Sequence, residues 1–284
     1  MDMPNKLFSL LNLIRFDRPV GFLLLFFPCS FGVALAAVRG SDYFFLVTFF
    51  LGSIIMRSAG CIINDILDVK IDAKVERTKN RPLVTGEVTV NEALMLLAML
   101  LFCGVILLSN LSLQAIMLGL VVMILVVFYP LAKRITDWPQ IVLGFIFGSG
   151  VLIAYSSIAH YLSFSAMLTY TGAIFWIIGY DTIYAFMDIK DDEVAGVKSS
   201  ALFLKDRDYK KWLGAFYLAF WFLSLLGAII EGRYSVMSLF LGSLGVLFIL
   251  AWQVHTLDIS SPKNCMIRFK SNVLVGFIWM IALL

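Results

Sequence analysis

Long runs of apolar residues, separated by short polar stretches, constrain the fold of this chain more than any other feature. A membrane-spanning helix needs about 20 such residues. Nine runs reach or approach that length, at residues 20–38, 43–63, 92–109, 113–131, 140–160, 163–187, 212–230, 235–254 and 271–284. A composition that is 61% hydrophobic and 14% charged excludes an ordinary soluble domain. The sequence therefore predicts an all-α, polytopic transmembrane bundle of about nine helices, whose last run is short for a span.

The segments between the runs contain no Pro/Gly/Ser-rich linker and no low-complexity tract. We therefore expect residues 1–284 to form a single domain. A weak internal echo relates the second and sixth runs. Arg57, Asn64, Asp68 and Asp72 follow one another at spacings of seven, four and four, and Asp181, Asp188 and Asp192 at spacings of seven and four.

The Lys and Arg residues between the runs predict the orientation in the membrane, because such residues stay on the cytoplasmic side. With the N-terminus inside, nineteen of them lie on that side and only Arg39 and Arg233 on the other, with Arg57 left inside a run. The sequence shows neither a cleavable signal peptide nor an Arg/Ser-rich transit peptide. These features predict a multi-pass protein of a bacterial inner (plasma) membrane, with both acidic clusters facing the cytoplasm.

The two acidic clusters stand where apolar runs end. Residues four apart share a face of a helix. Asn64, Asp68 and Asp72 are therefore expected to point one way, and so are Asp188 and Asp192. Oxygen ligands grouped in this way suit Mg²⁺, which prefers carboxylates together with the phosphate oxygens of a substrate.

Basic residues follow the first cluster at once, with Arg77 and Arg81 before a helix-stopping Pro82. Acids that hold Mg²⁺ beside bases that pair with phosphate oxygens are typical of a diphosphate site. The alternative is a solvated loop that obeys the orientation rule and whose acids merely pair with its bases.

Arg57 is the most unusual single residue, since it lies within an apolar run, on the same predicted face as Asn64. An arginine at the centre of a membrane costs about 2.5–3.5 kcal/mol on insertion scales, so it needs a partner. That partner is either an anionic group of a substrate or an internal acid such as Asp181.

Several motifs resemble those of the UbiA superfamily of intramembrane prenyltransferases. The run Asn64-x3-Asp68-x3-Asp72, followed by Arg77-x3-Arg81-Pro82, is similar to the first motif of that family, and the stretch at 180–201 to its second. The tracts Tyr180-Asp181-Thr182 and Gly196-Val197-Lys198-Ser199, together with Arg15-Phe16-Asp17-Arg18-Pro19, narrow the resemblance to the branch that uses 4-hydroxybenzoate. Phe27 departs from the tryptophan usual in that branch, a change expected to affect packing only.

The resemblance implies an activity. A polyprenyl group would pass from polyprenyl diphosphate to the ring of 4-hydroxybenzoate, ortho to its hydroxyl, in a Mg²⁺-dependent step of ubiquinone biosynthesis. The partners implied are these two substrates and membrane lipid, and the sequence indicates neither nucleic acid nor a protein partner.

The resemblance also assigns roles to residues. The implied Mg²⁺ ligands are Asn64, Asp68, Asp72, Asp188 and Asp192. The diphosphate would contact Arg77, Arg81, Lys133 and Lys198, and the acceptor carboxylate Arg57, with Asp181 nearby. Asp68, Asp191 and Asp192 are the candidate catalytic residues, and Asp191 joins the metal ligands or accepts the ring proton.

Two alternatives stay open at this point. A relative in the same superfamily would use another acceptor, such as a naphthoate, a haem or a chlorin. A secondary transporter would also carry intramembrane charges and internal repeats, but its binding residues would lie near the midplane on broken helices. A purely structural membrane subunit leaves Arg57 and the paired acids unexplained.

Overall fold

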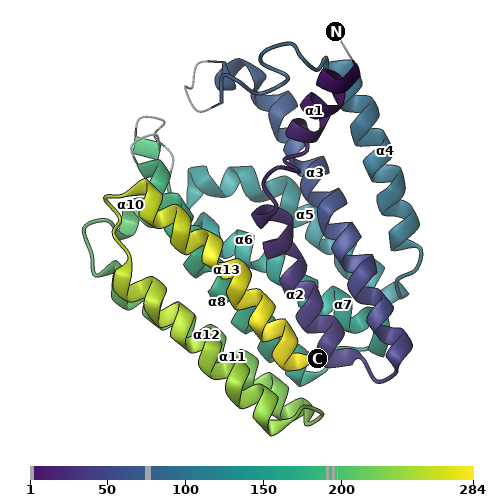
Figure 1. The fold of residues 1–284 in the computed structure, drawn as a ribbon, viewed down its shortest axis with the longest axis vertical. Helices are drawn as coiled ribbons and strands as arrows, with labels where there is room; N and C mark the ends of the chain where they lie inside the picture. Colours follow the sequence, from purple (N-terminus) through teal and green to yellow (C-terminus); the bar gives the residue numbers. More distant parts are fainter. Residues whose placement is uncertain (1–2, 74–77, 190–191, 194–195, 197) are drawn as a thin grey trace. The chain divides into compact units, whose positions relative to one another are not determined.

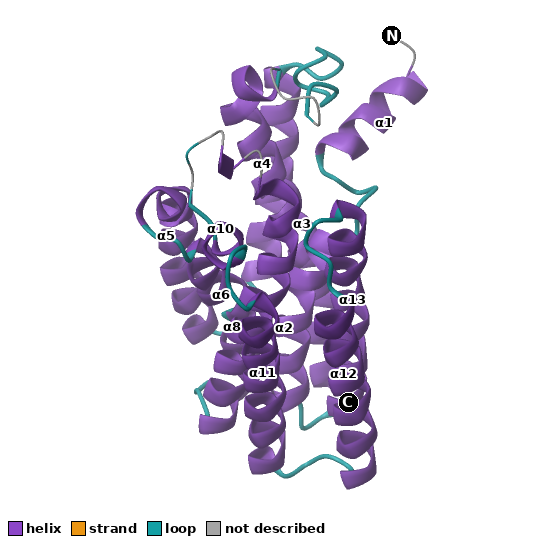
Figure 2. Ribbon diagram, turned by 90° about the vertical axis from the view of Figure 1, so that its left-hand side faces the viewer, coloured by secondary structure: helices purple, strands orange, loops and turns teal. Residues whose placement is uncertain are grey.

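The computed structural model describes residues 3–73, 78–189, 192–193, 196 and 198–284. The secondary structure over these residues is helical, with no strand (Figures 1 and 2). This confirms the all-α prediction. The chain divides into two compact units, residues 1–25 with 47–111 and residues 26–46 with 112–284. The single domain expected over residues 1–284 stays a prediction.

The first unit contains α1 (Met3–Leu13), the start of α2 (Val20–Ala36), most of α3 (Phe44–Asp72) and α4 (Val90–Leu108). Figure 1 shows α1 beside α4 and the C-terminal end of α3. A small apolar core joins these elements, formed by Leu13, Ile62, Leu83, Val88 and Ala93. This core fixes the end of α3, where the first acidic cluster lies.

Polar contacts at the start of α4 secure α1 in the same unit. Thr89 and Glu92 form a capping box that satisfies the first backbone N–H groups of α4. The Lys6 ammonium donates to the Glu87 carbonyl at 2.8 Å and to the Glu92 carboxylate at 2.6 Å. One glutamate thus caps α4 and holds α1.

The second unit contains the rest of α2 and a 3₁₀ turn (Gly40–Tyr43), followed by the later helices of the chain. These are α5 (Leu113–Ile135), α6 (Pro139–Gly148), α7 (Gly150–Ala159), α8 (Phe164–Ala185), a 3₁₀ turn (Phe186–Asp188), α10 (Ser200–Leu204), α11 (Tyr209–Glu231), α12 (Val236–Thr256) and α13 (Pro262–Leu283). In Figure 2, α11 and α12 run side by side.

The centre of the second unit is aromatic. The fully buried Trp176 ring of α8 stacks on Phe220 of α11, with the ring centroids 5.2 Å apart. The Trp176 indole N–H donates to the Asn272 side chain at 2.8 Å, so this buried donor of α8 is satisfied by an acceptor on α13. Glycines such as Gly172 let α8 and α11 approach closely, because a Cβ at that position would lie 2.7 Å from the Ser224 hydroxyl oxygen.

Six helical stretches among the described residues are long and apolar enough to cross a membrane: Gly40–Lys70, Val90–Leu108, Pro139–Ala159, Tyr209–Glu231, Val236–Thr256 and Pro262–Leu283. Val20–Ala36 and Leu113–Val126 are shorter apolar helices. The predicted number of about nine is therefore not confirmed. The run at 163–187 forms α8, whose Thr and Tyr residues and Asp181 lower its hydropathy, and α8 is not among the six.

The last predicted run, by contrast, is longer than expected. The sequence pattern starts it at residue 271, because charged residues precede that point. The helix begins at Pro262, with Ser261 as N-cap, and has 22 residues. Helix α13 is thus long enough to span, and the expectation of a short final run is wrong.

Candidate functional site

The first acidic cluster divides between two faces of α3. Asn64 and Asp68 are exposed, whereas Asp65 is 2% exposed and Asp72 is 6% exposed. Helical geometry explains the split, since each residue turns the helix by about 100°. Asp72 follows Asn64 by eight residues, so its side chain points about 80° away from that of Asn64 around the helix axis. It therefore points within about 20° of Asp65. Asn64, Asp68 and Asp72 therefore do not form one exposed stripe.

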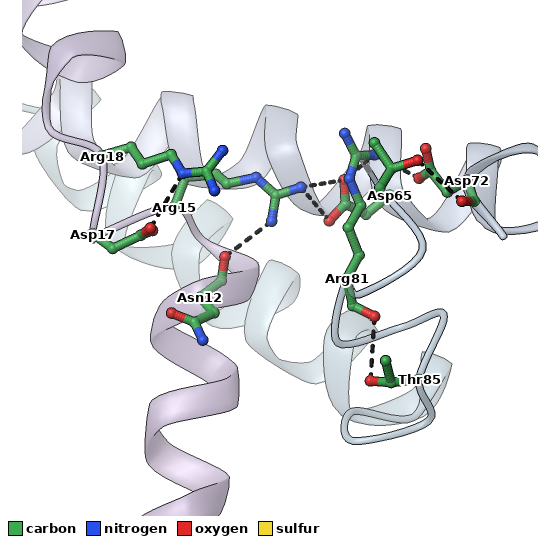
Figure 3. A network of polar contacts seen from close by, with 9 residues as sticks. Asn12, Arg15, Asp17, Arg18, Asp65, Asp72, Arg81 and Thr85 are labelled. Atoms are coloured by element: carbon green, nitrogen blue, oxygen red, sulfur yellow. Dashed lines mark hydrogen bonds and ion pairs between the residues drawn. The ribbon is translucent and has the colours of Figure 1, made fainter. Parts of the chain in front are cut away.

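Asp65 and Asp72 lie in a network with two arginines (Figure 3). The Arg15 Nη2 donates to both Asp65 oxygens, at 2.9 and 2.8 Å, and the Arg15 Nη1 donates to the Asn12 carbonyl at 3.0 Å. The Arg81 Nη1 donates to Asp65 at 3.0 Å and to Asp72 at 2.5 Å. Two buried carboxylates thus meet two guanidinium groups, which is the condition for keeping such charges away from water.

This network bears on the role expected of Arg81. The sequence assigned Arg81 to a substrate phosphate, with an acid–base pair within the loop as the alternative. The structure shows the acid–base pair, with Asp65 and Asp72 as partners. A contact with diphosphate stays a prediction for Arg81. Arg77 lies outside the described residues.

Asp65 is a buried site residue that sequence reasoning missed. Two signals in the sequence could have indicated it. It stands seven residues before Asp72, so the two share a face, and it is an acid two residues after the apolar run at 43–63 ends.

Arg57 lies on α3 and is exposed. Helix α2 passes close to it at Gly21, where an added Cβ would lie 2.7 Å from the Arg57 Nε. A glycine therefore leaves the space that the guanidinium group occupies. Asp181, its alternative partner, belongs to the other unit, and that ion pair stays a prediction.

The second acidic cluster lies where α8 ends. Asp181 stands in the last turns of α8, Asp188 closes the 3₁₀ turn that follows, and Asp192 comes shortly after it; all three are half-buried. Asp191 lies outside the described residues. Helix α10 begins after this cluster, at Ser200. The buried Ser200 hydroxyl forms a 2.7 Å hydrogen bond with the buried Thr182 hydroxyl of α8. Gln140 accepts from the Ser200 backbone N–H at 3.2 Å, so buried polar groups close the loop that carries this cluster.

Two further basic residues were expected to bind diphosphate. Lys198 is exposed and lies 3.7 Å from Asp137, a distance at which a surface ion pair contributes little. Lys133 is part of α5, but its side chain is outside the described part of the structure. The roles of both stay predictions.

The described residues contain no group of three or more His, Cys, Asp or Glu side chains that could hold a metal by themselves. Mg²⁺, however, is usually held by one or two carboxylates and by substrate phosphate oxygens, not by a dedicated protein cage. The exposed Asn64 and Asp68, one turn apart on α3, fit a metal that arrives with a diphosphate. The two clusters belong to different units, so a metal shared between them stays a prediction.

Comparison with known proteins identifies the class. The model of the UbiA prenyltransferase family matches residues 25–281, and the chain belongs to this family. It is a multi-pass membrane protein with the fold of an intramembrane prenyltransferase.

Curated relatives narrow the similarity further. The chain is 42% identical over 272 residues to the mitochondrial 4-hydroxybenzoate polyprenyltransferase of Aedes aegypti, covering 94% of this chain and 60% of the relative. It is 41% identical over 278 residues to the protein of the same name from Caenorhabditis elegans, covering 97% of this chain and 77% of the relative. The chain thus spans between three fifths and four fifths of the length of these relatives.

Solved structures agree on the fold. A UbiA homolog from Aeropyrum pernix K1 superimposes with a TM-score of 0.72 at 24% identity, over 92% of this chain and 94% of that one. A UbiA homolog from Archaeoglobus fulgidus, bound to DMAPP and Mg²⁺, gives a TM-score of 0.68 at 17% identity, over 96% of this chain and 99% of that one.

The relatives also correct the predicted location. The sequence pointed to a bacterial inner membrane, but the relatives compared here are mitochondrial proteins, so that prediction, and the cytoplasmic side that it implied for the acidic clusters, is wrong. The reason is physical. A bias of Lys and Arg orients a chain in the membrane that it enters and does not tell which membrane that is.

Proposed function

We propose that this prenyltransferase moves a polyprenyl group from polyprenyl diphosphate to the ring of 4-hydroxybenzoate, ortho to the hydroxyl, in ubiquinone biosynthesis. One structural observation carries the proposal: Asn64 and Asp68 are exposed side by side where an apolar helix ends, in a chain of this family. The names of the relatives at about 40% identity support 4-hydroxybenzoate as the acceptor.

The reaction breaks the bond between the allylic carbon and the diphosphate oxygen, forms a bond from that carbon to the ring, and releases the ring proton. The leaving diphosphate carries most of the charge to be stabilised. Bound Mg²⁺ supplies a Lewis acid for these oxygens. The exposure of Asn64 and Asp68 supports them as ligands, and the proposed set is completed by Asp72, Asp188 and Asp192.

The basic residues near the clusters hold the outer phosphate oxygens. This set contains Arg77, Arg81, Lys133 and Lys198. Asp192 acts with Asp68 at the reacting diphosphate, and Asp191 either joins them or accepts the ring proton. Helices rich in apolar residues keep water from the allylic cation, which water would otherwise quench.

Arg57 holds the carboxylate of 4-hydroxybenzoate and so turns the electron-rich ring toward the allylic carbon. Its exposure and the space left by Gly21 support this role. A guanidinium group suits a carboxylate because it donates two parallel hydrogen bonds.

The test is prenyl transfer in detergent or in membranes, with radiolabelled 4-hydroxybenzoate, a long-chain polyprenyl diphosphate and Mg²⁺. We expect a prenylated product that EDTA abolishes and Mg²⁺ restores. Product with a naphthoate but not with 4-hydroxybenzoate would refute the acceptor and keep the class of reaction. A folded protein that forms no product with any aromatic acceptor would refute the proposal.

A further inference from the structure

Asp65 is paired with two arginines in the first unit, and the proposed reaction gives it no task. Its carboxylate is buried and accepts three hydrogen bonds from guanidinium groups, two from Arg15 and one from Arg81. The neighbouring Asn64 and Asp68 are exposed and suited to a metal. Unlike the exposed Asn64 and Asp68, Asp65 is buried and is paired with the basic residues Arg15 and Arg81.

Arg15 approaches Asp65 through an unusual backbone conformation. It lies between α1 and α2 with φ of 57°, in the left-handed region that residues other than glycine rarely adopt. Such a conformation persists only where the surroundings hold it. Here the Arg15 guanidinium is held by the Asn12 carbonyl and by Asp65 (Figure 3). The backbone at Arg15 is therefore strained, and in this conformation the Arg15 side chain reaches Asp65.

The same carboxylate determines where the Arg81 side chain lies. The loop of Arg81 is fixed by its own contacts, since the Arg81 N–H donates to the Thr78 carbonyl at 3.0 Å and Val88 is buried in the apolar core. These contacts place the backbone, and Asp65 then holds the guanidinium beside Asp72. Within the described residues both carboxylate pairs of Arg81 use Nη1, whereas a guanidinium group has five N–H donors. Nη2 and Nε keep the geometry to meet phosphate oxygens.

We propose that Asp65 is a positioning residue for diphosphate binding: it holds the Arg81 guanidinium at the end of α3, and Arg15 holds Asp65. Arg15 balances the charge of Asp65, and Asp72 is the second carboxylate partner of Arg81. This inference rests on the proposed function, because it takes diphosphate as the ligand of Arg81.

Asp65→Asn tests the inference, because the amide keeps the shape of the side chain and removes its charge. The probe is inorganic pyrophosphate with Mg²⁺, titrated calorimetrically into the full-length protein in detergent with no aromatic acceptor present. Hydrogen bonds to charged groups are strong, so we expect affinity for pyrophosphate to fall about tenfold. The KM for polyprenyl diphosphate should rise by a similar factor, and the KM for 4-hydroxybenzoate should not change. Asp206→Asn, at an exposed position between α10 and α11, is the matched control and should change neither value.

A second comparison separates positioning from mere stability. If Asp65 acts through Arg81, the substitution Asp65→Asn should weaken pyrophosphate binding no further in an Arg81→Ala background. If the losses of pyrophosphate affinity caused by the two substitutions multiply in the double variant, the inference is overturned. An unchanged pyrophosphate affinity in Asp65→Asn, or an equal rise in both KM values, would also overturn it.

Arg15→Lys serves if Asp65→Asn does not fold. A lysine keeps the charge but cannot bond both carboxylate oxygens in the plane of a guanidinium group. We expect a smaller loss of pyrophosphate affinity in the same direction, and no loss would overturn the inference. Wild-type protein that fails to bind pyrophosphate with Mg²⁺ would refute the proposed function itself, whereas wild-type binding that Asp65→Asn leaves unchanged would refute only the role of Asp65.

Discussion

At the scale of single residues, neighbours on α3 have different environments. Asn64 and Asp68 face outward, while Asp65, between them in sequence, is buried against Arg15 and Arg81. A helix turns by about 100° per residue, so adjacent acids serve different purposes. The exposed acids can bind a metal and the buried one can hold arginines.

Asp68→Asn should abolish turnover, because the amide offers Mg²⁺ a single neutral carbonyl oxygen in place of the charged carboxylate that attracts the ion. The fold should survive, since Asp68 is exposed. The measurement is product formation alongside the melting temperature in detergent. Asp206→Asn is the matched control and should keep full activity. Full activity in Asp68→Asn would remove Asp68 from the metal site.

Gly21→Ala should weaken the use of the aromatic acceptor. The new Cβ would lie 2.7 Å from the Arg57 Nε, so the guanidinium group must move. A misplacement of about 1 Å can cost up to about 100-fold in rate, so we expect at least a tenfold rise in the KM for 4-hydroxybenzoate. The KM for polyprenyl diphosphate should stay the same. Gly60→Ala, on α3 with no atom within 4 Å of its Cβ, is the control. Equal acceptor KM values in the two variants would show that Gly21 does not position Arg57.

At the scale of elements, close approach between helices depends on glycines, which have no side chain. Gly242 of α12 faces α13, where an added Cβ would lie 2.3 Å from the Ala282 Cβ. Without a hydrophobic force between helices in lipid, such close packing is a main source of their association. Gly245 lies one turn further along α12, and its added Cβ would meet the Ile278 side chain at 3.4 Å, an ordinary contact.

Gly242→Ala should therefore separate α12 from α13 and destabilise the second unit by about 1–3 kcal/mol, the usual effect of overpacking. Gly245→Ala should be tolerated and is the matched control in the same helix. Thermal melts in detergent compare the two. A melting temperature in Gly242→Ala as high as in Gly245→Ala would contradict the close packing.

The sequence periodicity predicted which segments are helical better than it predicted where the helices end or which residues contact each other. The all-α fold and helices in all the apolar runs follow from local patterns, and so does the shared face of Asn64 and Asp68, whereas Asp72, which was expected on that face, is buried. The start of α13 was missed because an N-cap at Ser261 and a proline at the first position extend the helix through charged residues. The pairing of Arg15 with Asp65 joins residues 50 apart, and no local pattern reports a contact over that separation.

At the scale of the whole molecule, the binding of diphosphate and the binding of Mg²⁺ are expected to depend on each other. The described residues hold no ready-made metal cluster, and the proposed ligands need phosphate oxygens to complete the coordination of Mg²⁺. Binding of the native state by such a complex raises stability in proportion to the logarithm of its concentration.

Pyrophosphate and Mg²⁺ together should therefore stabilise the protein, by about 2.7 kcal/mol when the complex is present at 100 times its dissociation constant. Either component alone should have a much smaller effect. Melting temperatures in detergent, with and without EDTA, measure this. The shift should disappear in Asp68→Asn, and an equal shift with Mg²⁺ alone would show that the protein holds the metal without the substrate.

The exposure of helix α4 has a consequence for the substitutions that it tolerates. Ala93 is its one fully buried residue, and most of its other side chains point outward. Once Thr89 and Glu92 have started the helix, its exposed positions need only apolar character, whereas Leu96, Leu97 and Leu100 pack against the core of the first unit. In a saturation library, Leu, Ile, Val, Phe and Met should exchange almost freely at the exposed positions of α4, whereas most substitutions of Asp65 should lower activity. Tolerance along α4 would then reflect the lipid around the enzyme, and restriction at Asp65, Arg15 and Arg81 would reflect its chemistry.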